Sequence, residues 1–197
     1  MTQPSMKRYR CGYRRRGVIA HRPFRQGDLD GLCGVYSVVN AIRVLCPELD
    51  RDDFEWLFDH LMQSIGKAGA DPAVSVAGGI GQRVFAALVR EAIRQLAAEY
   101  DISLLSQRLP KRLRRSTNLA GFWRLLAARL SPTCVAVLGT EGYRAHWTIA
   151  VRATNRQIRL FDSGQMQVLR RSDCTVGKAA NRTGISLPHV FLIERGD

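Results

Sequence analysis

The spacing of apolar residues changes between the two parts of this 197-residue chain. As far as about residue 130, apolar positions recur every three or four residues, which is the period of an α-helix with one buried face. This spacing predicts helices over 33–45, 51–66, 84–100 and 118–130. The Gly- and Ala-rich segment 69–81, between the second and third of these helices, is predicted to be a mobile loop.

The C-terminal part shows the pattern of short β-strands instead. Gly, Asn or Pro turns separate runs rich in Val, Ile, Phe and Thr, which occupy 134–139, 145–152, 157–162, 168–169 and 190–193. Residues 153–156 are predicted to form the hairpin loop between the second and third strands. A helical N-terminal half packed on a C-terminal antiparallel sheet is an α+β fold.

The chain is predicted to consist of a basic N-terminal arm, 1–25, and a single domain, 26–197. We expect a short strand within 9–20 and a loop over 23–31. No apolar run approaches the roughly 18 residues that a membrane span needs, and 1–16 lack the apolar core of a secretory signal. The expectation is therefore a chain without a transmembrane segment, located in the cytoplasm or exported as a signal-less effector.

The formal net charge of +13 raises the question of a nucleic-acid partner. Basic runs at 7–10, 14–16 and 111–115 are able to neutralise phosphates, but no nucleic-acid-binding motif accompanies them. Of the basic residues, 26 are Arg and 4 are Lys, a bias that a GC-rich genome produces without selection for binding. The same charge also suits an acidic protein or membrane surface.

The cysteines and histidines do not have metal-ligand spacing. The chain has no CxxC and no pair of histidines four residues apart; its cysteines are at 11, 33, 46, 134 and 174 and its histidines at 21, 60, 146 and 189. Unevenly spaced cysteines also argue against a disulfide scaffold and favour a reducing compartment. We expect neither a metal site nor a cofactor.

Cys33 is the first candidate for chemistry. It follows the Gly- and Asp-rich stretch 26–31 and opens the predicted helix 33–45, where unpaired backbone N–H groups and the helix dipole favour a thiolate. A thiolate is a strong nucleophile, and a neighbouring imidazole takes up its proton and later protonates a leaving amine. The structural alternative is that Cys33 is a small buried hydrophobic residue.

His146 and Asp162 are the candidate partners of that thiol. His146 begins one predicted strand and Asp162 ends the next, so antiparallel pairing brings them to the same edge of the sheet, where the carboxylate holds the imidazole in the required tautomer. The Gln26 amide and the Cys33 backbone N–H are predicted to stabilise an oxyanion. The structural alternatives are a strand histidine, a turn-capping aspartate and a solvated loop glutamine.

These residues carry a resemblance to the papain-like superfamily of cysteine peptidases. It rests on Gln26, Leu32-Cys33-Gly34, His146-Trp147 and Phe161-Asp162-Ser163, and it covers about 26–164. Within the superfamily the chain looks most like the bacteriocin-processing (C39-type) peptidases and the Josephin-type deubiquitinases. The resemblance implies a papain-like fold with the nucleophile at the start of a central helix.

The predicted function is a thiol hydrolase that cleaves an amide bond in a polypeptide through a Cys-His-Asp triad and an acyl-enzyme. The substrate stays open between a leader peptide, a ubiquitin-like tag and a host protein. A glutamine deamidase or an acyltransferase effector uses the same triad and differs in what enters the acyl site. The alternative from another class is a basic interaction module in which the site is idle.

Overall fold

The computed structural model describes residues 22–27, 30–142, 145–178 and 180–196. The helices are α1 (Cys33–Leu45), α2 (Arg51–Lys67), α3 (Pro72–Gly78), α4 (Gln82–Tyr100), α5 (Lys111–Ser116) and α6 (Leu119–Arg129). The strands are β1 (Leu104–Arg108), β2 (Cys134–Gly142), β3 (His146–Ala153), β4 (Gln157–Leu160), β5 (Val168–Arg170), β6 (Cys174–Val176) and β7 (Thr183–Arg195). The predicted α+β class is confirmed.

One sheet forms the middle layer of the molecule. Its strand order is β1-β7-β2-β3-β4-β5, and every neighbouring pair along this path is antiparallel. The predicted antiparallel sheet is therefore confirmed along this path, whereas β6 pairs with β7 in parallel. The loop predicted over 153–156 does join β3 to β4, which pair as a hairpin.

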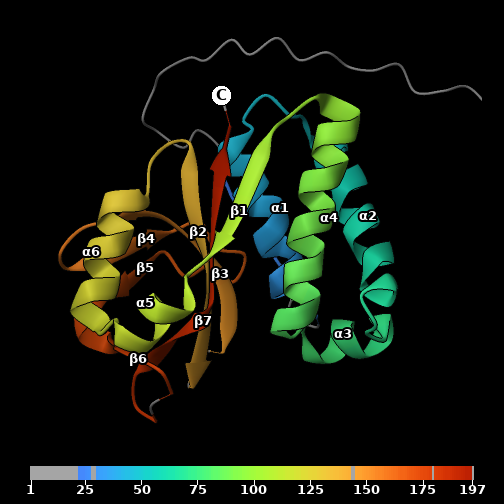
Figure 1. Cartoon of the computed structure of the whole chain (residues 1–197). Coiled ribbons are helices and arrows are strands. Elements are labelled where there is room, and N and C mark those ends of the chain that lie inside the picture. The colour runs from blue at the N-terminus through green and yellow to red at the C-terminus, as the bar shows by residue number, and fades with distance from the viewer. Residues whose placement is uncertain (1–21, 28–29, 143–144, 179, 197) are drawn as a thin grey trace, which may run out of the picture.

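Helices cover both faces of the sheet (Figure 1), with α1, α2 and α4 on one side and α6 on the other. Each side has its own cluster of buried side chains. The larger cluster joins α1, α2 and α4 to the sheet, and the smaller one lies beneath α6. The central helix α1 is buried over most of its surface, as its nearly continuous apolar sequence predicts.

Helix starts follow the capping residues in the sequence. Asp50 accepts a hydrogen bond from the Asp53 backbone N–H, and the Asp53 carboxylate accepts one from the Asp50 N–H, which makes a capping box for α2. Asn118 caps α6 in the same way through the Gly121 N–H. The prediction that Gly66 ends the second helix is wrong by one residue, because α2 continues to Lys67.

Five elements depart from the predictions, and one of them is strand β6, which was not predicted. Part of the loop predicted over 69–81 is α3, which the sequence pattern hides because Ser75 is its one buried residue. Strand β1 buries only Leu104, and α5 buries no residue, so neither shows an apolar stripe. Strand β7 begins at Thr183, well before the predicted 190, since Gly184 and Pro188 interrupt its β-type composition.

The first and last described segments are both tied to α1. The Arg195 guanidinium donates to the Leu45 carbonyl at the end of α1, 2.9 Å away, and pairs with the Glu48 carboxylate at 2.6 Å. Phe24 exchanges two backbone hydrogen bonds with the side chain of Asn40 on α1, and its ring also packs against Phe54 of α2 with centroids 5.6 Å apart, so the described end of the predicted arm contacts the domain. The strand predicted within 9–20 lies outside the described residues.

Within the described ranges, no single helix is both long and apolar enough to cross a membrane.

Candidate active site

Cys33 is the first residue of α1, as the sequence predicts. No side chain caps this helix start; instead, Asp30 Oδ1 accepts a hydrogen bond from the Leu32 N–H at 3.0 Å, and Asp30 Oδ2 accepts one from the Gly27 N–H at 2.9 Å. Asp30 therefore shapes the loop that precedes the cysteine. The first turn of α1 contains no acidic side chain, so the positive end of its dipole would favour an anion at the helix start, where Cys33 lies.

His146 and Asp162 lie together at one edge of the sheet. The His146 Nε2 and the Asp162 Oδ1 are 2.8 Å apart. The Asp162 side chain is fully buried, whereas the His146 side chain keeps 16% of its surface exposed. Pairing of β3 with β4 produces this proximity, since the Phe161 N–H donates to the Ile149 carbonyl just before the carboxylate.

Two further hydrogen bonds fix the orientation of the Asp162 carboxylate. Its Oδ2 accepts the N–H of Gly164 at 2.8 Å and the N–H of Met166 at 3.0 Å. Burial alone raises the pKa of the Asp162 carboxyl, but the hydrogen bond from His146 and the neighbouring imidazole charge bring that pKa below its usual value. Asp162 is therefore an ionised acceptor at neutral pH.

The imidazole of His146 links the carboxylate to the thiol. Burial lowers the pKa of His146, whereas its side-chain hydrogen bonds to Asp162 and to Cys33 raise it, and the balance brings the pKa to about 9. Because Nε2 is engaged by Asp162, Nδ1 is the ring nitrogen left to serve Cys33. His146 therefore stands between an acid that orients it and a thiol whose proton it is placed to accept.

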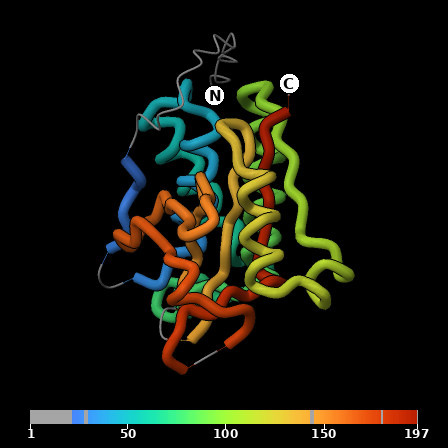
Figure 2. Tube along the Cα trace, turned by 90° about the vertical axis from the view of Figure 1, so that its left-hand side faces the viewer, coloured from blue at the N-terminus to red at the C-terminus, as the bar shows by residue number. Residues whose placement is uncertain are grey.

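Gln26 lies at the same site, but its side chain forms a hydrogen bond within its own loop. Its backbone N–H donates to the Ser163 carbonyl at 3.2 Å, which brings the loop before α1 next to Asp162. Figure 2 shows this segment beside the chain that follows β4. The Gln26 amide nitrogen donates to the Asp30 carbonyl, so one of its two hydrogens is engaged within the loop. The second hydrogen is the one available to an oxyanion.

Two polar side chains that position these groups, Asn40 and Ser37, were not among the residues predicted to form the site. The Asn40 amide accepts the Phe24 N–H at 2.8 Å and donates to the Phe24 carbonyl at 2.9 Å, two residues before Gln26. The Ser37 hydroxyl donates to the Trp147 carbonyl at 2.8 Å, next to His146. The available signal was two polar residues in the mostly apolar and buried run 35–42, because buried polar groups require partners.

The connection between α3 and α4 packs against the loop that precedes Cys33. The Gly31 N–H donates to the Val76 carbonyl, and a Cβ on Gly31 would lie 2.5 Å from the Gly79 nitrogen. The Trp147 indole N–H donates to the Ile80 carbonyl at 3.0 Å. The Gly-rich connection therefore lies beside the site, where hydrogen bonds and close packing hold it in place.

The other described cysteines are more deeply buried than Cys33. Cys33 is partly exposed, whereas Cys46, Cys134 and Cys174 are buried. Burial raises the pKa of Cys46 to about 12 and that of Cys174 to about 11, and it also raises the pKa of Cys134. Reactivity toward electrophiles should therefore distinguish Cys33 from these three. Among the described residues, no three His, Cys, Asp or Glu side chains are grouped as metal ligands.

Comparisons with known proteins place the chain in no family. No protein-family model, no curated protein and no solved structure matches it. Support for a function therefore comes from the residues themselves, above all from the link that His146 makes between Cys33 and Asp162.

Proposed function

We propose that this chain is a cysteine hydrolase of papain-like architecture that cleaves an amide bond in a polypeptide. The observation that carries the proposal is the position of His146, which is hydrogen-bonded to a buried aspartate and to a thiol at a helix N-terminus. Each partner has a chemical task that matches its surroundings, and together they fill the roles of a nucleophilic triad.

In the first half-reaction, His146 takes the proton of Cys33, and the thiolate attacks the carbonyl carbon of the scissile amide. The carbon–sulfur bond forms, and the negative charge that develops on the carbonyl oxygen is stabilised by the Cys33 backbone N–H and the second hydrogen of the Gln26 amide. His146 then gives its proton to the amide nitrogen. The carbon–nitrogen bond breaks, and an amine leaves.

The second half-reaction releases the acyl group. A water molecule attacks the thioester carbonyl while His146 accepts one of its protons. The carbon–sulfur bond breaks, the proton returns to the Cys33 sulfur, and the acyl group leaves with a new carboxyl terminus. Throughout both steps Asp162 holds the Nε2 side of the ring and stabilises the imidazolium.

Cysteine alkylation tests whether the site is reactive or idle. In a Cys11→Ser background, which removes the cysteine outside the described residues, we expect iodoacetamide to label Cys33 at neutral pH much faster than Cys46, Cys134 or Cys174. His146→Ala should slow this labelling strongly, whereas the matched control His60→Ala, on α2, should not. Labelling of Cys33 that is no faster than that of the buried cysteines would indicate an idle site.

Cleavage of a proteome-derived peptide library tests the reaction itself. New amino termini, identified by mass spectrometry, should appear with the wild-type protein and be absent with Cys33→Ala and His146→Ala, because the remaining groups cannot bypass the removed steps. Circular dichroism should show that both variants keep the fold. Identical peptide profiles for the wild type and Cys33→Ala would refute the proposed reaction.

A further inference from the structure

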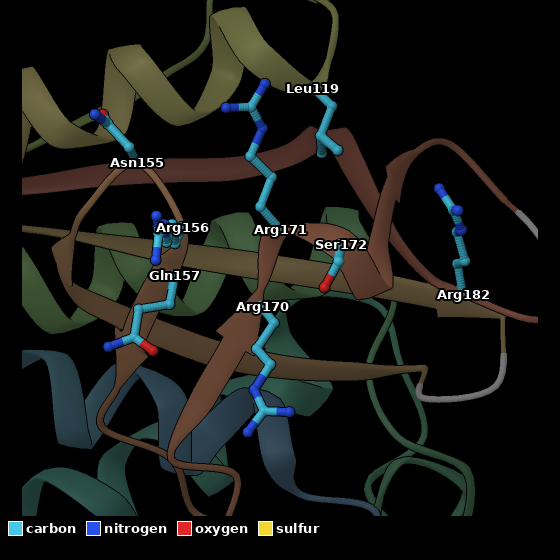
Figure 3. Close-up of a pocket in the computed structure, with 8 residues that line it drawn as sticks. All are labelled: Leu119, Asn155, Arg156, Gln157, Arg170, Arg171, Ser172 and Arg182. Atoms are coloured by element: carbon cyan, nitrogen blue, oxygen red, sulfur yellow. The ribbon is translucent and has the colours of Figure 1, made fainter.

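A wide hollow with strongly basic walls lies away from Cys33, at the opposite end of β4 and β5 from Asp162. Its volume is about 720 Å³. Four arginines contribute to its lining (Figure 3), together with amide, hydroxyl and leucine side chains from the turn before β4, the end of β5 and the start of α6. We refer to Arg156, Arg170, Arg171 and Arg182 as the arginine cluster.

Pairing within the sheet brings these side chains together. Arg170 on β5 lies opposite Gln157 on β4, and the Arg171 N–H donates to the Arg156 carbonyl at 2.8 Å. The turn before β4 and the turn after β5 are separate in the sequence, and they therefore place the guanidinium groups of their arginines around one hollow. None of the four arginines forms an ion pair with a described carboxylate, and the adjacent Asp173 accepts the Ser172 hydroxyl at 2.7 Å.

The basic character continues onto the neighbouring sheet surface. Arg152 on β3 and Arg159 on β4 are directly opposite each other, and both are exposed. Like charges that face each other across a strand pair destabilise a sheet. Between 145 and 193 the sequence carries seven Lys or Arg residues and only two acids, Asp162 and Asp173. A bound anion would therefore offset repulsion between the positive charges of this region.

The arrangement of the cluster indicates the shape of that anion. In Figure 3, Arg170 and Arg171 extend in opposite directions and Arg182 stands apart from both, so the guanidinium groups are spread along the hollow instead of converging on one point. A spread of planar, forked donors suits an extended chain that carries several carboxylates or phosphates. The eight lining residues include no aromatic side chain on which a nucleobase could stack.

The position of the arginine cluster relative to the candidate active site favours a polypeptide as its ligand. Strand β5 is the last strand on this side of the sheet path, and β4 and β5 lead from the cluster to the segment that contains Asp162 and Met166. At about 3.3 Å per strand residue, the two regions are roughly 15–20 Å apart, which is the length of about five extended residues. One extended chain is able to reach both.

We propose that the arginine cluster binds an acidic segment of the polypeptide that the active site cleaves, about five residues from the scissile bond. The inference rests on the proposed hydrolase function for its substrate role, but the binding itself needs no catalysis. Glutamate or aspartate side chains would pair with the guanidinium groups, and the amides of Asn155 and Gln157 would add hydrogen bonds at one end of the hollow.

Direct binding is measured with the Cys33→Ala protein, which cannot cleave the probe. The probe is a fluorescein-labelled oligoglutamate of about eight residues, roughly 26 Å long when extended, and binding is followed by fluorescence anisotropy. Oligoglutamine of the same length and a single-stranded DNA of matched charge are the comparison probes. We expect the oligoglutamate to bind most tightly, and to bind more weakly as salt is added.

Two double variants distinguish an effect of the arginine cluster on binding from an effect of the overall charge. Arg156→Gln/Arg170→Gln should raise the Kd for oligoglutamate by about tenfold, since each exposed ion pair contributes a few-fold. Arg83→Gln/Arg90→Gln removes the same charge from exposed positions of α4 and should change the Kd less than about twofold. Equal effects of the two variants, or an absence of oligoglutamate binding, would overturn the proposal; tighter binding of the DNA that depends on the cluster would replace it with a nucleic-acid site.

The peptide library tests the substrate role separately. Peptides cleaved by the wild type should be enriched in acidic residues about five positions from the cleaved bond. The enrichment should disappear with the cluster variant and persist with the α4 variant. Cleavage without acidic enrichment would overturn the substrate role while leaving the hydrolase function intact, whereas oligoglutamate binding without Cys33-dependent cleavage would refute the hydrolase and leave only the acidic-ligand site.

Discussion

Replacement of Asp162 by Asn is the most informative single change, because the backbone around residue 162 decides how the new amide must point. Asp162 Oδ2 accepts two backbone N–H groups, from Gly164 and Met166, while Oδ1 accepts from His146 Nε2. An asparagine has only one side-chain oxygen to offer. If that oxygen keeps the two backbone bonds, the amide NH₂ group faces His146.

In the opposite orientation, the amide NH₂ group would face the backbone N–H groups of Gly164 and Met166. The free-energy cost of that orientation follows from the hydrogen bonds that would be lost. The opposite orientation would leave two buried N–H donors against an NH₂ group, at about 1–3 kcal/mol each, in exchange for one hydrogen bond to the ring. A net difference of roughly 3 kcal/mol corresponds to a population ratio on the order of 10². The dominant orientation directs a donor at Nε2, which disfavours the imidazolium and selects the tautomer whose Nδ1 carries a proton.

The expected result for Asp162→Asn is therefore a pKa of His146 well below the value of about 9 in the wild type, and alkylation of Cys33 at neutral pH that is slower by 10²-fold or more. NMR titration of the His146 ring carbons and mass spectrometry of the alkylated protein supply the two measurements. Asp173→Asn is the matched control, because Asp173 is exposed and lies beyond β5. An unchanged pKa of His146 together with wild-type alkylation would refute the reasoning.

The effect of Asp162→Asn can also be measured through the pH dependence of the free energy of unfolding. The shift of the His146 pKa from 6.5 to about 9 corresponds to roughly 3 kcal/mol in favour of the imidazolium. Because the folded-state pKa is raised, this stabilisation is complete below pH 6.5 and is lost as the pH rises through 9; the lowered pKa of Asp162 removes it again in acid. Urea unfolding should show that Asp162→Asn is most destabilising between about pH 4 and 6.5, and much less so above pH 9.

Three further changes test the surroundings of the site. Gln26→Ala should lower kcat toward a library-derived peptide by roughly 10²–10³-fold while leaving iodoacetamide labelling of Cys33 nearly unchanged, because only the first reaction forms an oxyanion; full kcat would assign the oxyanion role to the backbone alone. Asn40→Ala should lower the free energy of unfolding by about 2–4 kcal/mol in urea titrations, since it leaves both polar groups of the Phe24 peptide without their partner. Gly31→Ala should cost about 1–3 kcal/mol by pressing a Cβ against the Gly79 nitrogen, whereas Gly78→Ala, with nothing within 4 Å, should cost far less.

The sequence was sufficient to predict the parts of this site that depend on periodicity. The start of α1 at Cys33 follows from a Gly- and Asp-rich stretch that gives way to an apolar helical run, and the meeting of His146 with Asp162 follows from the pairing of two adjacent strands across a short hairpin. Each inference needs only local spacing and one rule of antiparallel geometry. For the same reason, most of the helices were predicted to within a few residues.

The parts that escaped prediction depend on contacts between distant segments. Strand β1 buries one residue and pairs with the far end of β7, so its sequence alone carries almost no strand signal. The contact of the α3–α4 connection with Gly31 results from how the helices stack, which spacing does not specify. The arginine cluster is assembled from separate turns, whereas the conspicuous basic run at 111–115 forms α5 and lines no part of that hollow.

The arrangement of α1 explains how so few residues can hold the whole site in one geometry. Cys33, Ser37 and Asn40 are spaced by four and three residues, so they share one face of the helix. The first carries the thiol, the second binds the carbonyl of the residue after His146, and the third binds the peptide two residues before Gln26. A rotation of α1 would therefore disturb the contacts to Trp147 and Phe24 as well as the position of Cys33, the proposed nucleophile. An apolar residue at position 37 or 40 would leave these backbone groups without their partners, so the two buried polar side chains support the proposal that this helix positions groups around Cys33.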